Sequence, residues 1–249
     1  MSKRPLIVLG ILLLLLLSMA SGQKLGSGTK VGSGTRIATA SPSAATPTPT
    51  PDFLTDTFTA ATDEDLTAHT PEVGSTWIDH TDGAYSDPIG ILASEDQIYK
   101  TSGSGAGMYY NDAAPPSANY CCECVMRKLT TISANASIAW RVDTASNTMM
   151  IFQINNGTGW RMRKIVAGTQ TTIGVEDTTT NIPADGESRT MTACSNGNTH
   201  TAFINGVLLG TVGGTDSSVT AAGKAGVRFN GTFTSTTGYH LSSLRCYPL

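Results

Sequence analysis

The chain is poor in charge, in aromatic side chains and in helical periodicity. Charged residues make up 14% of its 249 positions and aromatic residues 6%, and no segment keeps apolar residues at helical spacing for three turns. From Phe53 to Leu249 there are 11 basic and 18 acidic residues, a net charge of −7. With this balance, a basic surface of the kind that binds nucleic acids or anionic membranes is not indicated.

Several short catalytic and metal-binding motifs are also missing. The sequence contains neither Gly-x-Ser-x-Gly nor His-Glu-x-x-His, and its four histidines, at positions 69, 80, 200 and 240, are scattered singly. The cysteines lack the paired Cys-x-x-Cys spacing of a zinc site. No common hydrolase or zinc protein is therefore indicated.

Turn signals are abundant. Asn205-Gly206 lies between two short apolar and threonine-rich runs, which predicts a β-hairpin with a type I′ turn, because both residues tolerate positive φ. Similar dipeptides occur at positions 82–83, 156–157, 185–186, 196–197 and 230–231. The folded part is therefore predicted to be all-β.

The predicted strands follow one another at short spacing. Residues alternate between apolar and polar along 151–155 and 224–229, as in sheets that bury one face. About twelve strands within 200 residues suit a two-sheet antiparallel β-sandwich of the jelly-roll type. The predicted strands are 53–58, 89–93, 118–129, 135–142, 148–154, 160–166, 170–175, 188–195, 199–204, 207–212, 224–230 and 239–247.

The first 22 residues have the features of a secretory signal peptide. Lys3 and Arg4 precede an aliphatic run from Leu6 to Ala20, and residues 20–22 are small. The run is shorter than the roughly 20 residues that span a bilayer, so an uncleaved anchor is the weaker alternative. The protein is therefore expected to be secreted or displayed at the cell surface, with no membrane insertion after cleavage.

Residues 23–52 are predicted to be a linker. Residues 24–41 repeat with a period of six, and residues 42–51 favour an extended polyproline II spacer. The repeat can be a flexible Gly/Ser linker, or a strand that docks on a sheet edge of its own or a neighbouring chain. Residues 53–249 fit one domain in length.

Five cysteines in an exported chain permit disulfides and leave at least one thiol free or intermolecular. If residues 120–126 form a strand, Cys122 and Cys124 share one face and Cys121 points to the other. We expect buried packing, or bridges to Cys194 or Cys246, rather than a metal. The pairing stays open.

Short motifs along residues 53–249 together resemble the concanavalin A-like lectin/glucanase superfamily, especially its laminin G-like jelly-roll modules. The resemblance implies a two-sheet sandwich whose last strand pairs beside the first. The motifs are Asp56-Thr-Phe58, His69-Thr-Pro71, Val73-Gly-Ser-Thr-Trp77, Ile138-Ala-Trp-Arg141, Trp160-Arg-Met-Arg-Lys164, Asn205-Gly206-Val207 and Gly223-Lys-Ala-Gly226-Val-Arg228.

Two places offer candidate ligand platforms. Trp160 follows a Gly-Thr-Gly turn beside cations, where an exposed indole can stack on a sugar ring; packing in the core or rim is the alternative. Tyr109 and Tyr110 form the second candidate, with Asn111 and Asp112 as hydrogen-bonding groups and Asp112 as a possible Ca²⁺ ligand. Trp77 and Trp140 are expected in the core.

Glucanases of this superfamily carry a Glu-x-Asp-x-Glu or Glu-x-Asp-x-x-Glu strand, and this chain contains no Glu-x-Asp. We therefore expect a non-catalytic carbohydrate-binding or adhesion module whose partner is a glycan or polysaccharide. One alternative is a structural subunit that uses the 24–41 repeat to bind itself or another surface protein. Another is a glycan-active hydrolase with a non-standard site.

Overall fold

The computed structural model describes residues 50–249 except Gly83. The predicted signal peptide, the 24–41 repeat and nearly all of the proline-rich spacer lie outside the described residues. Within them the chain is all-β apart from one short 3-10 turn, Leu66–Ala68. No helix in the described part is long and apolar enough to cross a membrane.

The described residues form sixteen strands. They are β1 (Leu54–Asp56), β2 (Glu64–Asp65), β3 (Trp77–Asp79), β4 (Ile89–Leu92), β5 (Gln97–Lys100), β6 (Ala106–Asn111), β7 (Tyr120–Thr130), β8 (Asn135–Asp143), β9 (Thr148–Asn155), β10 (Gly159–Val166), β11 (Thr169–Asp177), β12 (Ser188–Asn196), β13 (Thr199–Ile204), β14 (Val207–Thr215), β15 (Lys224–Asn230) and β16 (Gly238–Pro248).

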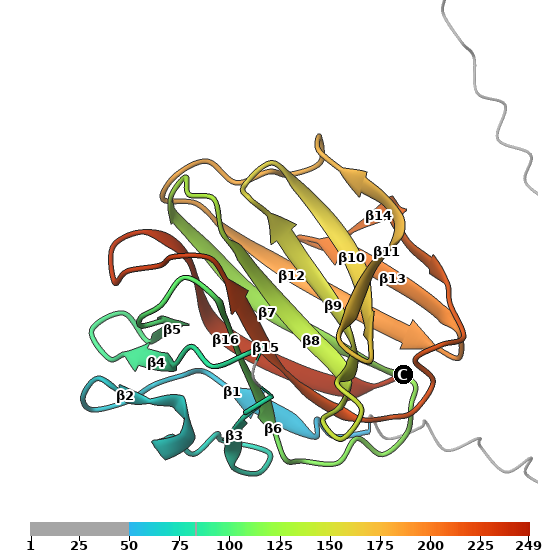
Figure 1. Cartoon of the computed structure of the whole chain (residues 1–249), viewed down its shortest axis with the longest axis horizontal. Helices are drawn as coiled ribbons and strands as arrows, with labels where there is room; N and C mark the ends of the chain where they lie inside the picture. Colours follow the sequence, from blue (N-terminus) through green and yellow to red (C-terminus); the bar gives the residue numbers. More distant parts are fainter. Residues whose placement is uncertain (1–49, 83) are drawn as a thin grey trace, which may run out of the picture. The chain divides into compact units, whose positions relative to one another are not determined.

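The strands are arranged in two layers, which overlap in Figure 1. The first sheet has the order β2-β4-β5-β16-β7-β12-β13-β14, and the second has the order β11-β10-β9-β8-β15-β6-β3. One residue pair, Gly174 with Val212, joins the two sheets through β11 and β14. The first strand, β1, pairs with the last, β16, so the arrangement implied by the family resemblance is confirmed.

The core lies between the two sheets and is built on three tryptophans. Trp77, Trp140 and Trp160 are at most 2% exposed. Each indole N–H has an acceptor within 2.8 Å, in Asp56, Ser195 and Thr180 respectively. Trp140 and Ser195 come from β8 and β12, so this hydrogen bond joins the two layers inside the core.

Tight hairpins connect neighbouring strands where the sequence predicts them. Asn205 and Gly206 have φ of 51° and 77° between β13 and β14, and Asn156 and Gly157 have φ of 47° and 71° between β9 and β10. Positive φ at both central residues is the type I′ geometry. The predicted Asn205-Gly206 hairpin is therefore confirmed.

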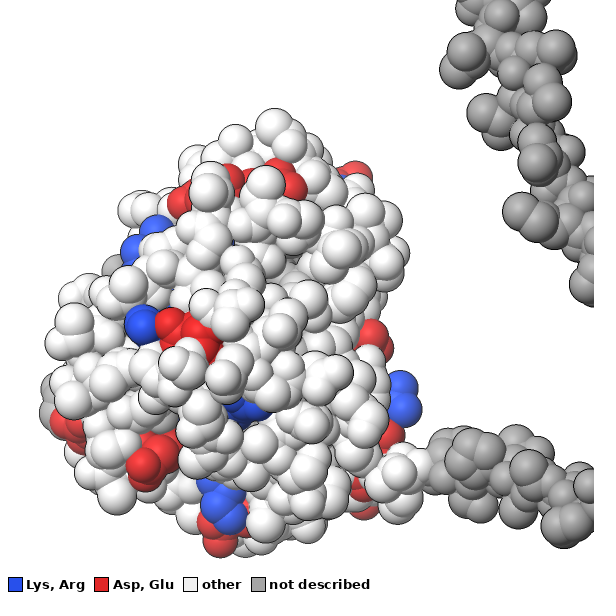
Figure 2. Space-filling model, turned by 90° about the vertical axis from the view of Figure 1, so that its right-hand side faces the viewer, with Lys and Arg blue, Asp and Glu red and all other residues white. Residues whose placement is uncertain are grey.

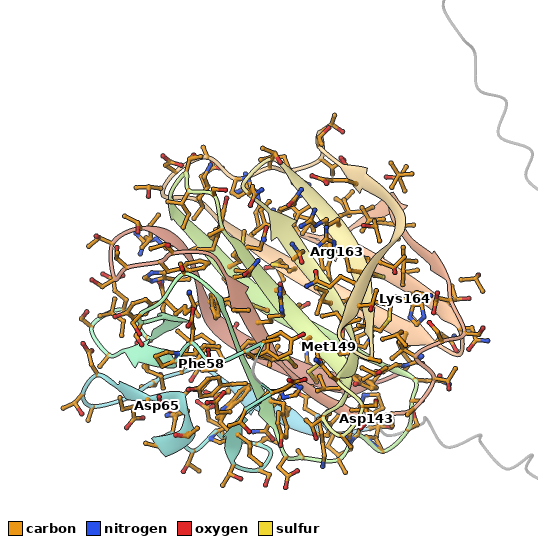
Figure 3. The ribbon with its side chains drawn as sticks, viewed as in Figure 1. Phe58, Asp65, Asp143, Met149, Arg163 and Lys164 are labelled. Carbon is orange, nitrogen blue, oxygen red and sulfur yellow. A yellow bond between two sulfur atoms is a disulfide. The ribbon has the colours of Figure 1, made fainter. Side chains whose placement is uncertain are left out.

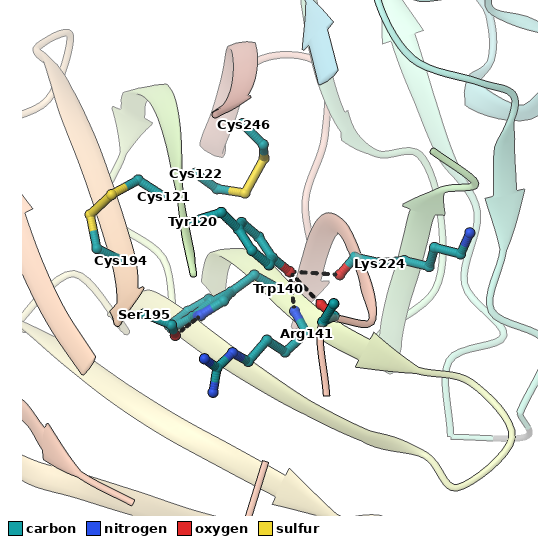
Figure 4. Close-up of a disulfide and its surroundings, with 10 residues drawn as sticks. Tyr120, Cys121, Cys122, Trp140, Arg141, Cys194, Ser195, Lys224 and Cys246 are labelled. Atoms are coloured by element: carbon teal, nitrogen blue, oxygen red, sulfur yellow. Dashed lines mark hydrogen bonds between the residues drawn. A yellow bond between two sulfur atoms is a disulfide. The ribbon is translucent and has the colours of Figure 1, made fainter. Parts of the chain in front are cut away.

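Two disulfides attach β7 to its neighbours (Figure 4). Cys121 bonds Cys194 on β12, and Cys122 bonds Cys246 on β16. Each bridge joins residues that are directly opposite in the strand register. Cys124 is the free, buried cysteine. The two disulfides place the folding of the chain in an oxidising environment.

Four strands were not predicted: β2, β3, β5 and β6. The first three have only two to four residues each, too few for a periodic signal. The fourth, β6, follows the glycine-rich stretch 103–107, which predicts a loop. Tyr109 and Tyr110 therefore lie inside the second sheet rather than on a loop.

Candidate functional site: the outer face of the second sheet

The second sheet has an outer face, which points away from the first sheet and the core. Along β10, Trp160 and Met162 belong to the main core, whereas Ile165 belongs to a separate buried cluster. That cluster lies on the outer face and consists of Tyr85, Ala106, Met108, Ala139, Val142, Met149, Ile151 and Ile165. Side chains at every second position of β6, β15, β8, β9 and β10 thus meet on a face that the main core does not use.

Two adjoining pockets open at one end of this face, and we call them together the Tyr110 groove. The larger, of about 650 Å³, is lined by Asp79, His80, Thr81, Asp82, Tyr110, Thr144, Ala145, Ser146, Asn147 and Ala167. The smaller, of about 270 Å³, is lined by Tyr110, Asp112, Val142, Asp143, Thr144, Ala221, Gly223 and Lys224. Tyr110 and Thr144 line both pockets, so the two are neighbours.

The groove combines an aromatic wall with polar groups. The His80 ring lies edge-on to Tyr110, with 6.3 Å between centroids, and packs on Tyr85 at 5.1 Å. Burial lowers the pKa of His80, although Asp82 acts in the opposite direction. The imidazole is therefore neutral at pH 7, and it presents one donor and one acceptor.

Three polar atoms of the groove residues have no partner. Asp79 Oδ1, His80 Nε2 and Asn147 Oδ1 are buried without a hydrogen bond to any described residue. The other end of the Asn147 amide donates to Asp82 Oδ2 and so fixes the side chain. Since buried polar groups are nearly always satisfied, the groove holds unused capacity for a polar ligand.

The middle of the outer face is cationic. Arg161 and Arg163 point outward from β10, and Arg228 points outward from β15. In Figure 3, Arg163 lies away from Asp65 and Asp143, which are near the opposite edge of the molecule. Elsewhere, Figure 2 shows a largely uncharged side of the molecule, with small separate charged groups.

Three of the predicted ligand residues are buried, which corrects their assignment. Trp160 is 0%, Asn111 1% and Tyr109 2% exposed, so none can present a platform to a sugar. Phe152 packs on Trp160, and the Asn111 amide bonds Ser75 and Ala113. These residues stabilise the fold and do not face the groove.

The structure brings the other two predicted residues to the groove. Tyr110 is half-buried and lines both pockets, and Asp112 lines the smaller one. Asp112 forms an ion pair of 3.1 Å with Lys224. Among the described residues no three His, Cys, Asp or Glu side chains are grouped as metal ligands, so the Ca²⁺ hypothesis gains no support from Asp112.

Sequence reasoning missed His80, Asn147, Arg161, Arg163 and Arg228 as members of this face. For the arginines of β10 a signal existed, because Arg161 and Arg163 alternate with the apolar Trp160 and Met162 in a predicted strand. His80 and Asn147 come from separate loops, and only the fold brings them together.

No family model matches the chain, and no curated protein matches its sequence. Solved structures do match its fold. One is a structure of the endo-acting O-glycanases that prominent members of the human gut microbiota express to initiate mucin breakdown. It matches with a TM-score of 0.53 and 9% identity, over 80% of this chain and 100% of that one.

Two glucanases are similar to the same degree. A prokaryotic β-1,3-1,4-glucanase (lichenase) from a mouse hindgut metagenome gives a TM-score of 0.51 at 8% identity, over 75% of this chain and 98% of that one. The Bacillus licheniformis β-glucanase gives 0.50 at 10% identity, over 76% and 99%. The chain therefore has the concanavalin A-like lectin/glucanase fold.

Proposed function

We propose that this protein is a secreted or surface-displayed, non-catalytic module that binds carbohydrate in the Tyr110 groove. The observation that carries the proposal is the make-up of the groove, where one half-buried aromatic ring is surrounded by carboxylate, amide and hydroxyl side chains. Sugars present an apolar ring face for stacking and hydroxyls that both donate and accept, and this set of side chains complements both features.

The outward positions of the four central strands favour binding over hydrolysis. Glycosidases of the common type need two carboxyl groups, about 5 to 9.5 Å apart. The outward positions of β15, β8, β9 and β10 hold Lys, Gly, Arg, Asn, Ser, Ala, Val, Met, Ile and Gln, and no Asp or Glu. Carboxylates close to these strands line the Tyr110 groove, and three of them, Asp82, Asp112 and Asp143, are already bonded to Asn147, Lys224 and Ser146 respectively.

Export is supported by two independent features. The first is the sequence of residues 1–22, which has the pattern of a signal peptide. The second is the pair of disulfides, which persist in oxidising compartments. A glycan partner outside the cell fits both features.

The test is a glycan and polysaccharide binding screen with the protein and its Tyr110→Ala variant, run with Ca²⁺ and with EDTA. Tyr247→Ala is the matched control, because Tyr247 is also half-buried but lies on β16 in the other sheet. We expect binding that Tyr110→Ala weakens at least tenfold and the control leaves unchanged. Absence of binding to every glycan, or equal loss in both variants, would contradict the proposal.

A further inference from the structure

Three arginines lie in the middle of the outer face without an ion-pair partner among the described residues. The register places Arg228 beside Ser137, Ser137 beside Gln153, and Gln153 beside Arg161. Arg228 and Arg161 therefore lie three strands apart, about 14 Å, in one row across the sheet. Arg163, two residues after Arg161 on β10, lies in the next row.

None of the three arginines forms an ion pair with a described residue. The cation of Arg228 is 3% exposed, its Nε has no hydrogen-bond partner, and its Cζ lies 5.5 Å from the centre of the Tyr85 ring. Arg163 Nη1 donates to the neutral Gln170, and its Nε is likewise unpartnered. For Arg161, the neutral Gln153 amide accepts from Nε and Nη2 when it is oriented with its oxygen toward the guanidinium.

The electrostatics agree with this geometry. Burial and the neighbouring charges of Arg163 and Arg228 together lower the pKa of Arg161 to about 10, against the opposite effect of one acid, Glu176. Glu176 is itself held by the Asn155 amide, with both carboxylate oxygens at 2.9 Å. A buried charge without a partner, as at Arg228, is unfavourable, and the nearby charges of Arg161 and Arg163 add to the positive potential, so the cluster favours an anion.

The arginines adjoin the Tyr110 groove. Tyr110 contacts His80, His80 packs on Tyr85, and the Tyr85 ring stacks on the Arg228 guanidinium. Tyr110 and Arg163 also lie in one cross-strand row through Gly226, Ala139 and Ile151. A chain of sugars that begins in the groove can continue across the strands toward β10.

We propose, on the basis of the carbohydrate-binding function proposed above, that the ligand is an acidic glycan whose carboxylate or sulfate groups contact Arg161 and Arg163. Arg161 and Arg163 are partly exposed and can form two-pronged hydrogen bonds with either group. Arg228 is covered by Tyr85 and cannot contact the ligand directly, so it attracts the acidic groups through its charge alone. A neutral glycan would leave all three cations uncompensated.

The test compares the binding of dextran sulfate, polygalacturonate and neutral dextran to the protein and to two variants. One variant is Arg161→Gln with Arg163→Gln. Its control, Arg127→Gln with Arg245→Gln, removes the same net charge at two ion pairs of the first sheet, with Glu95 and Asp52. We expect at least one acidic polymer to bind at least tenfold more tightly than dextran, and the β10 variant alone to lose roughly tenfold or more of this affinity. The ratio of the two acidic polymers identifies sulfate or carboxylate as the preferred group.

Different failures have different meanings. If a neutral glycan binds in a Tyr110-dependent way and neither acidic polymer binds more tightly, the acidic-glycan inference is wrong and the carbohydrate-binding proposal stands. Equal losses in both double variants would mean non-specific attraction and would also overturn the inference. If no glycan of any kind binds, both proposals fail.

Arg228→Met supplies a second measurement that does not depend on Arg161 and Arg163. Because it removes a buried charge that has no ionic partner, we expect an unchanged or higher midpoint of urea unfolding, together with weaker binding of the acidic polymer. A lower midpoint with unchanged binding would assign Arg228 to the stability of the fold and remove it from the proposed site.

Discussion

The disulfide between Cys122 and Cys246 should stabilise the fold mainly by restricting the unfolded chain. The bridge spans 124 residues, and the loop-closure relation gives about 5 kcal/mol for a loop of that length. The bridge between Cys121 and Cys194 spans 73 residues, for which the same relation gives about 4 kcal/mol. Losing either bridge would remove a large share of the stability of an ordinary domain, which is about 5 to 15 kcal/mol.

We expect Cys122→Ala with Cys246→Ala to lower the free energy of unfolding by about 4 to 5 kcal/mol, measured by urea denaturation. The dependence on urea should become steeper, because the released chain exposes more surface when it unfolds. Cys124→Ala is the matched control. It lies on the same strand, is fully buried, and loses a sulfur without losing a cross-link, so we expect a loss of about 1 kcal/mol.

Restriction of the unfolded chain would not be the cause if the double variant lost no more than twice the stability lost by Cys124→Ala, with an unchanged urea dependence. Sulfur packing in the core would then account for the whole effect. The same comparison for Cys121→Ala with Cys194→Ala checks the dependence on loop length, with a smaller expected loss.

Three further predictions concern single residues. Gly226→Ala would place a Cβ 2.2 Å from the Tyr109 carbonyl oxygen, so we expect the free energy of unfolding in urea to fall by roughly 2 to 3 kcal/mol. Gly210→Ala is the control and should change this free energy little, because no atom lies within 4 Å of the added Cβ. Arg141→Met should lower the free energy of unfolding by about 3 kcal/mol, because the carbonyls of Ala118, Gly197 and Val219 lose the donor that they share. Its control, Arg245→Met, breaks an exposed ion pair and should lower it by less than about 1 kcal/mol. Burial would raise the pKa of Asp216, but hydrogen bonds from Lys164 and Ser218 lower it from 3.8 to about 2. The ionised Asp216 should therefore contribute about 2 kcal/mol to the free energy of unfolding above pH 4, and this contribution should disappear between pH 4 and 2. Unfolding curves of Asp216→Asn across that range should lack this part of the acid dependence, and an unchanged slope would contradict the assignment.

The all-β fold could be predicted because its signals are local. Asn205-Gly206 specifies its own hairpin, and alternation along 151–155 and 224–229 marks strands with one buried face. Such signals need a few neighbouring residues only. They fail for β2 and β3, which are held by partners far along the chain rather than by their own pattern.

The candidate site was harder to predict because burial is a property of the assembled layers. The Gly-Thr-Gly turn before Trp160 indicates an exposed loop edge, yet the indole packs on Phe152 and donates to Thr180. Tyr110 lies at the groove, so it stays a ligand candidate, whereas its neighbour Tyr109 points into the core. One step along a strand reverses the face, and the sequence around a Tyr-Tyr pair does not say which of the two is outside.

The free thiol of Cys124 gives β7 and β16 a second way to pair. Cys246 lies opposite Cys122, and Leu244 lies opposite Cys124, so a slip of two residues would bring Cys246 opposite Cys124 instead. A slip of two keeps every side chain on its own face, and apolar alternation therefore cannot reject it. Once Cys122 and Cys246 are bonded, the slipped register can no longer form. Burial raises the pKa of the Cys124 thiol, and the protonated thiol does not exchange with the disulfide. The Cys122–Cys246 disulfide thus fixes β16 in its native register against β7.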